Sequence, residues 1–187
     1  MESELIIYQR EEIIDHLQKK FHAVHSFVYP LSDEFIRLKP SAEQWSVAEN
    51  LQHLILSSTP VATSLAVPSM VLWVFGLPKP RQSRSYIQLV SDYQQALAHG
   101  FEAPKEYVPY VGKDRSGLLS TLKRMEEKLV RRLNKWWKEE ELDKYMVPHP
   151  SLGKITMREL LFFTIYHTEH HLKIIEKRAE EVSHKIV

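Results

Sequence analysis

The chain has 187 residues, of which 43% are hydrophobic and 26% are charged, and its formal net charge is +1. We expect one globular domain over residues 1–187, and the near-zero charge gives no reason to expect a nucleic acid or an anionic membrane as partner. The absence of cysteine excludes disulfides and thiolate ligands. Because the acidic start also lacks a basic signal region, we expect a cytoplasmic protein.

The first predicted element is a helix over residues 4–30. Its apolar residues recur at spacings of three and four, which is typical of a helix with one buried face. This stripe consists of Ile14, Leu17, Phe21, Val24 and Val28.

The second predicted helix begins at Ser46. Ser46 and Glu49 form a capping box, in which each side chain bonds the backbone amide of the other residue. The helix continues through His53. Pro60 should kink or break it, because proline removes a backbone hydrogen bond and clashes with the preceding turn. Helical structure is expected to resume before Gly76.

An uncharged segment follows, since residues 50–78 contain no Lys, Arg, Asp or Glu. Its most apolar part, residues 61–77, is at the lower limit of a membrane-spanning helix and contains Pro68. We therefore expect a buried helix, or a helix at a homodimer interface, and no membrane span.

A long connection over residues 77–113 is punctuated by prolines and contains one short predicted helix at 85–97. Such a connection returns the chain along a bundle or carries function. The third predicted helix follows, and its apolar stripe covers about five turns. The stripe consists of Leu118, Leu122, Met125, Leu129, Leu133 and Trp136.

The fourth predicted helix begins at Thr156, where Thr156 and Glu159 form a second capping box, and continues to about Val182. A tight loop at 148–153 precedes it, and no segment has a convincing strand pattern. We predict an all-α fold, a four-helix bundle with a long crossover between helices 2 and 3. The second and fourth helices should then be antiparallel.

Three histidines stand at positions that should point into this bundle. The predicted inward stripe of the fourth helix consists of Leu160, Thr164, His167, His171 and Ile174. Residues four apart project in nearly the same direction, so His167 and His171 can bind one ion. His53, early in the antiparallel second helix, can meet them. The pattern predicts a divalent metal site. The alternatives are a hydrogen-bonded pair in the core and a solvated face.

Two further residues are candidates for supporting roles beside these histidines. His170 is rotated away from the stripe, so we expect it at the rim of the site or facing a substrate. Glu49 lies one turn before His53, although the capping box already explains it. No protein nucleophile is evident, because cysteine and a Ser-His-Asp pattern are lacking. The catalytic group is then expected to be water or a thiolate bound to the metal.

These motifs together resemble the DinB-like (DinB/YfiT) superfamily over nearly the whole chain. The resemblance rests on residues 45–54 (WSVAENLQHL), 148–153 (PHPSLG), 156–161 (TMRELL) and 167–171 (HTEHH). It implies a four-helix bundle that is often a homodimer. It also implies a divalent metal, often zinc or nickel, on the histidines that match the family's ligands here, His53, His167 and His171.

The resemblance also suggests a reaction. Characterised members include bacillithiol transferases and mycothiol-dependent isomerases, in which the metal activates a low-molecular-weight thiol. We therefore expect a metal-dependent S-transferase of detoxification, with a small-molecule thiol as cosubstrate and a small-molecule substrate. A metal-dependent hydrolase is the alternative enzyme, and a non-catalytic metal-binding or dimerisation module is the alternative outside enzymes.

Overall fold

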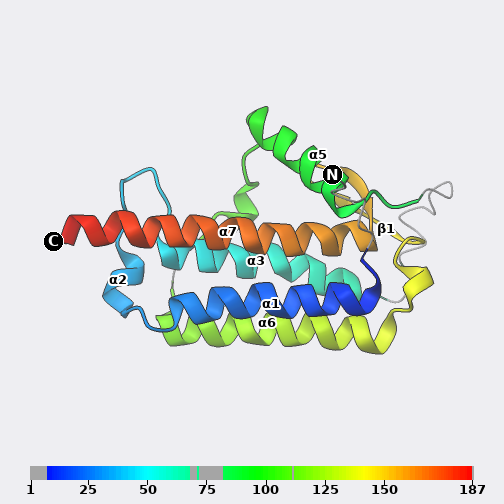
Figure 1. Ribbon diagram of the computed structural model, residues 1–187, viewed down its shortest axis with the longest axis horizontal. Coiled ribbons are helices and arrows are strands. Elements are labelled where there is room, and N and C mark those ends of the chain that lie inside the picture. The colour runs from blue at the N-terminus through cyan, green and yellow to red at the C-terminus, as the bar shows by residue number, and fades with distance from the viewer. Residues whose placement is uncertain (1–7, 68–70, 72–81, 111, 187) are drawn as a thin grey trace, which may run out of the picture.

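A four-helix bundle forms the body of the computed structural model, which describes residues 8–67, 71, 82–110 and 112–186. Figure 1 shows the four long helices running along the long axis of the molecule. They are α1 (Arg10–Val28), α3 (Val47–Ala66), α6 (Arg115–Trp136) and α7 (Met157–Ile186). Helix α3 runs parallel to α6 and antiparallel to α1 and α7, so the predicted bundle and its crossover are confirmed.

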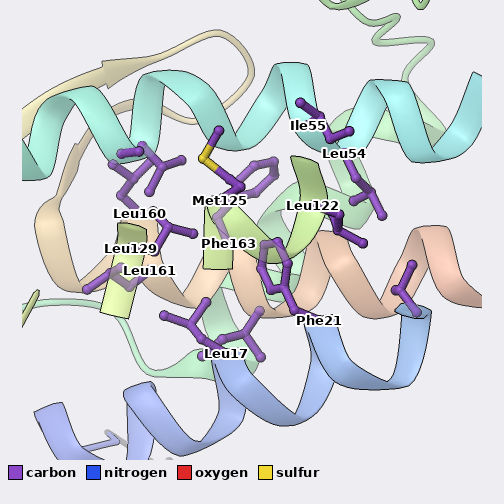
Figure 2. Packing of buried hydrophobic residues seen from close by; sticks show 14 of the residues in the cluster. Leu17, Phe21, Leu54, Ile55, Leu122, Met125, Leu129, Leu160, Leu161 and Phe163 are labelled. Atoms are coloured by element: carbon purple, nitrogen blue, oxygen red, sulfur yellow. The ribbon is translucent and has the colours of Figure 1, made fainter. Parts of the chain in front are cut away.

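The hydrophobic core lies between these four helices. Figure 2 shows side chains from all four converging there, among them Leu17 and Phe21 of α1, Leu54 of α3, Leu122 of α6 and Phe163 of α7. Full burial of one such side chain contributes roughly 1.5–3 kcal/mol. The bundle is therefore held together mainly by these apolar stripes.

In three of the predicted stripes, one buried position is occupied by the sequence neighbour of the predicted residue, where two like residues stand together. Ile13, Trp137 and Ile175 are buried to 5% exposure or less, where the pattern favoured Ile14, Trp136 and Ile174. A repeat of 3.6 residues allows either member of a doublet to face inward. Trp137 lies just beyond the end of α6, and its indole donates a 3.0 Å hydrogen bond to the carbonyl of Leu65.

Two predicted helix features differ in the structure. Helix α1 begins at Arg10, just after Gln9, whose amide donates a hydrogen bond to the Glu12 carboxylate at 2.7 Å. Residues 4–7 of the predicted helix lie outside the described residues. Helix α3 is not broken at Pro60, which lies on its exposed side. Proline removes a single backbone bond there, and the neighbouring Thr59 hydroxyl bonds the carbonyl of Ile55 at 2.8 Å.

The crossover between α3 and α6 contains the predicted short helix, α5 (Tyr86–Ala98), and a 3-10 turn at Lys105–Tyr107. Helix α5 packs on α7 outside the bundle (Figure 1). Because α5 and the segment before α7 cover its first turns, residues Met157 to Ile165 are buried on all sides of that helix. Two short elements not predicted are α2 (Asp33–Arg37) and a 3-10 turn at Glu139–Glu141.

A β-hairpin precedes α7, which corrects the expectation of no strands. Strand β1 (Met146–His149) pairs antiparallel with β2 (Gly153–Thr156), and Val147 lies opposite Ile155. Gly153 has a φ of 70°, a left-handed conformation that glycine adopts without strain. Strands of four residues are too short to show a clear alternating pattern.

Both predicted capping boxes are present. The Ser46 hydroxyl accepts from the Glu49 amide at 3.2 Å, and the Glu49 carboxylate accepts from the Ser46 amide at 2.7 Å. Thr156 and Glu159 form the equivalent pair at 3.1 and 2.9 Å. These caps fix where α3 and α7 begin, and hence which turn of each helix carries each histidine.

The described residues include only part of the uncharged segment. Val61, Ala62 and Leu65 of α3 are buried in the core. The helix expected before Gly76 and most of the expected interface at 61–77 lie outside the described residues. Across the part of the chain that the structure describes, none of the helices is long and apolar enough to cross a membrane.

We predict that Glu159→Ala strongly destabilises the protein. Glu159 is fully buried and accepts hydrogen bonds from the backbone and the side chain of Arg84 at 2.8 and 3.1 Å, in addition to its cap. Loss of one partner of a largely buried ion pair should lower the free energy of unfolding by about 2–4 kcal/mol in urea titrations.

The matched control is Glu49→Ala, which removes the same kind of cap and an ion pair with the half-exposed Lys39. That variant should lose only about 1 kcal/mol. Equal losses in the two variants would contradict a special role for the buried Arg84–Glu159 pair.

Candidate metal centre

Three histidine rings from two helices meet inside the bundle. His53 comes from α3, and His167 and His171 come from α7, one turn apart. The ring centroids lie 4.5–5.1 Å apart in all three pairs, and each residue is at most 6% exposed. One ligand atom from each ring lies within 4.8 Å of those of the other two, a grouping that could hold a metal ion.

Hydrogen bonds from the outer nitrogens orient two of these rings. Nδ1 of His53 donates to the carbonyl of Tyr107 at 2.7 Å, and Nδ1 of His171 donates to the side-chain oxygen of Asn50 at 2.9 Å. Asn50 is itself oriented, because its amide group donates to the carbonyl of Ser46 at 2.9 Å. With the proton on Nδ1, each Nε2 carries a lone pair, the form in which imidazole binds metals.

Burial keeps all three imidazoles neutral. It lowers the pKa of His53, against the opposing effect of the hydrogen bond to Tyr107. Burial, followed by repulsion from the neighbouring histidines, lowers the pKa of His167 and of His171 well below the usual value. Neutral rings can accept a cation without first losing protons.

The distance between two of the ligand nitrogens fits a tetrahedral ion. Nε2 of His53 and Nε2 of His167 are 3.3 Å apart. Two nitrogens bound to one tetrahedral zinc ion at 2.0–2.1 Å would lie roughly 3.3–3.4 Å apart. Three protein ligands leave a position open, as in catalytic rather than structural zinc sites.

The two residues expected to play supporting roles differ in where they lie. Glu49 lies at the start of α3, where its carboxylate caps the helix and binds Lys39 at 2.7 Å. The capping box accounts for it. His170 is half-buried at the edge of the histidine cluster, and its ring centroid lies 5.3 Å from that of His171. It also lines a cavity that lies beside the three histidines.

Sequence reasoning missed Asn50 and Tyr107. Asn50 carried a usable signal, because an amide one turn before His53 on an inward helix face needs a buried partner. Tyr107 contributes through its backbone carbonyl, which any residue type provides, so no sequence pattern could have identified it.

A cavity of about 250 Å³ opens beside the three histidines. The cavity is lined by Trp45, just before α3, and by His53 and Pro60 of α3. The crossover contributes Tyr93 and Phe101, and the hairpin contributes its two prolines. Aromatic and aliphatic side chains make up most of the wall. Among the described lining residues there is no Asp, Glu, Lys or Arg. The cavity is therefore apolar, and its polar groups are mainly imidazoles and hydroxyls.

Two further residues bring polar atoms to this wall. Burial, and to a lesser extent the nearby Tyr166, raises the pKa of Tyr93 to about 12, so its hydroxyl stays protonated. Burial, and to a lesser extent the positive charge of Arg84, lowers the pKa of His149 to about 4, so its imidazole stays neutral. Phe163 contacts both His149 and His167, with ring centroids 4.3 and 5.0 Å away.

Comparison with known proteins identifies relatives. A family model described as the DinB superfamily matches residues 16–175. No curated protein matches the sequence.

Three solved structures share the fold at low sequence identity. A conserved protein from Enterococcus faecalis has 15% identity and a TM-score of 0.62, and the match covers 92% of this chain and 95% of that one. The four-helix bundle protein TT2238 has 14% identity and a TM-score of 0.56, with coverage of 90% and 98%. YfiT from Bacillus subtilis, described as a probable metal-dependent hydrolase with an unusual four-helix bundle topology, has 16% identity and a TM-score of 0.53, with coverage of 95% and 87%.

We predict that His167→Ala loses the metal while the bundle stays folded. Two imidazoles cannot complete the site, so metal content should fall from about one ion per chain to below about 0.1 by elemental analysis. The control is His170→Ala, which removes a neighbouring imidazole outside the cluster and should keep its ion. Stoichiometric metal in His167→Ala would show that the ligand assignment is wrong.

A second prediction concerns Asn50, whose oxygen holds the His171 ring. Asn50→Ala leaves that ring free to turn and should weaken metal affinity about 10- to 100-fold in competition with a chromophoric chelator. Asn50→Asp keeps an acceptor for His171 Nδ1 and should stay within a few-fold of the parent affinity. Equal affinity in the alanine variant would mean that Asn50 does not orient the ligand.

Proposed function

We propose that this chain, which belongs to the DinB superfamily, is a divalent-metal-dependent enzyme that transfers a low-molecular-weight thiol to a small electrophile. The observation that carries the proposal is the cluster of three neutral histidines opening into an apolar cavity whose described lining residues include no carboxylate. A divalent ion held there, zinc or nickel in our proposal, would act as a Lewis acid that lowers the pKa of a bound thiol or water.

The composition of the cavity favours a thiol over water. A thiol has a pKa near 8.5, whereas water has a pKa of about 15.7. Helical zinc hydrolases pair their histidines with a glutamate that serves as general base. The described wall of this cavity offers no Asp or Glu. A thiol can be deprotonated without such a base, so the site suits it better.

The absence of cysteine means that the thiol must be a small molecule. In the proposed reaction the thiol loses its proton to water, and its sulfur forms a bond to an electrophilic carbon. The bond from that carbon to a halide breaks and the halide leaves. With an epoxide the carbon–oxygen bond breaks, and the ring oxygen takes up a proton.

The protein's own residues bind, orient and desolvate. Asn50 and the carbonyl of Tyr107 hold two of the histidine rings in position. The aromatic wall, which includes Tyr93 and Phe163, excludes water from the reacting groups. A thiolate in such a dry cavity is a stronger nucleophile than one surrounded by water.

A metal-dependent hydrolase is the second candidate. Its support is the description of the structural neighbour YfiT as a probable metal-dependent hydrolase. A metal-binding module without catalysis is the candidate outside enzymes. Cytoplasmic location, a detoxification role and a homodimer remain predictions from the sequence.

The test measures thiol consumption and ester hydrolysis on the same zinc- or nickel-loaded protein. Bacillithiol or L-cysteine is mixed with the uncharged electrophile monochlorobimane, and p-nitrophenyl acetate is the ester. We expect metal-dependent formation of the thioether, reduced on the order of 100-fold or more in His167→Ala and retained in Glu49→Ala. Metal-dependent ester hydrolysis without thioether formation would favour the hydrolase. Absence of both activities would favour the non-catalytic module.

A further inference from the structure

His149 is a polar residue of the cavity wall that the proposed reaction does not yet use. It lies at the end of β1, and three donors approach its Nδ1. They are the amide and the hydroxyl of Ser151, at 3.4 and 3.3 Å, and the amide of Leu152, at 3.3 Å. A backbone amide can only donate, so Nδ1 carries a lone pair and accepts.

The hairpin turn thereby fixes the tautomer of this ring. A neutral imidazole with an accepting Nδ1 carries its proton on Nε2, which is then a hydrogen-bond donor. The low pKa of His149 agrees with a neutral ring. Most side-chain hydroxyls can donate or accept, but Nε2 of His149 can only donate.

Among the described residues, none forms a hydrogen bond with Nε2 of His149. Within the described part of the chain, Arg178 Nε is the one side-chain nitrogen or oxygen that is both fully buried and without a partner. Nε2 of His149 is therefore accessible, and it belongs to a residue that lines the cavity.

The His149 ring and the histidine cluster share a neighbour. Phe163 contacts both His149 and His167, with ring centroids 4.3 and 5.0 Å away. A molecule lying along Phe163 could thus place one end near the three histidines and a polar atom near Nε2 of His149. The rest of that molecule would meet apolar wall, where a buried charge would be costly without a partner.

We propose that Nε2 of His149 selects and orients the substrate of this cavity, an uncharged and largely apolar small molecule that carries a carbonyl, ether or epoxide oxygen. This inference rests on the proposed function in taking the cavity as the site of the electrophile. It names the chemical class of that electrophile and the donor that recognises it.

The test compares binding of three probes of similar shape by NMR titration of the histidine-labelled full chain. Acetophenone carries an acceptor, α-methylstyrene has the same shape without one, and benzoate adds a negative charge. Titrations use zinc-loaded and chelator-treated protein, because a preference caused by the ion disappears on chelation, whereas one caused by His149 persists.

We expect acetophenone to bind roughly three- to tenfold more tightly than α-methylstyrene, the value of one neutral hydrogen bond. Benzoate should bind the chelated protein at least about tenfold more weakly than acetophenone. The His149 signals should show a protonated Nε2 and should shift on addition of acetophenone.

Two substitutions of His149 separate donation from hairpin structure. His149→Asn keeps an acceptor near the position of Nδ1 and therefore keeps the turn, but it lacks a donor at the position of Nε2. This variant should lose the preference for acetophenone. His149→Gln places an amide donor near the position of Nε2 and should keep that preference. The matched control Tyr93→Phe removes another cavity donor and should also keep the preference.

Three results would overturn the inference. They are a preference that survives in His149→Asn, a preference that is lost in Tyr93→Phe instead, and benzoate binding as tightly as acetophenone in the chelated protein. Because binding is measured without turnover, a failed thioether assay leaves this test unaffected, and failed binding leaves the catalytic test unaffected.

Discussion

The burial of three neutral imidazoles against one another is the constraint on which the rest of the structure depends. Leucines at these positions would stabilise the bundle more, since a buried polar ring without a partner costs about 1–3 kcal/mol. The protein offsets part of this cost with acceptors for the outer nitrogens of His53 and His171. The inner nitrogens of His53 and His167, 3.3 Å apart, are left facing each other. A shared cation would bind both of these nitrogens.

The crossover and the hairpin complete the surroundings of the three rings. The turn at Lys105–Tyr107 supplies the carbonyl that fixes His53, and α5 supplies Tyr93 to the cavity wall. The hairpin before α7 supplies His149. The bundle thus holds the candidate ion site, whereas the segments outside it shape the space in which a substrate would bind. Changes in those segments could alter the substrate without altering the ion site.

The bundle and the meeting of the three histidines could be predicted because they follow from helix periodicity and from two capping boxes. Ser46 and Thr156 set the start of each helix, and the spacing of the histidines does the rest. The ligand assignment itself stays a prediction. Doublets such as Trp136 and Trp137 could not be resolved, because either member fits a 3.6-residue repeat.

Other parts of the site lie beyond sequence patterns for physical reasons. The contact of Tyr107 is made by a backbone carbonyl, which carries no residue signature. The hairpin has strands of four residues, too short for an alternating pattern, and Pro60 was tolerated because it lies on an exposed side of α3. The role of His149 depends on a turn that only the folded chain forms.

The most direct measurement is a crystal structure of the zinc-soaked protein with anomalous scattering recorded at the zinc edge. We expect one strong anomalous peak about 2.0–2.1 Å from Nε2 of His53, His167 and His171, with Nδ1 of His171 still bonded to Asn50. A peak bound elsewhere, or rings turned away from an empty centre at saturating zinc, would contradict it.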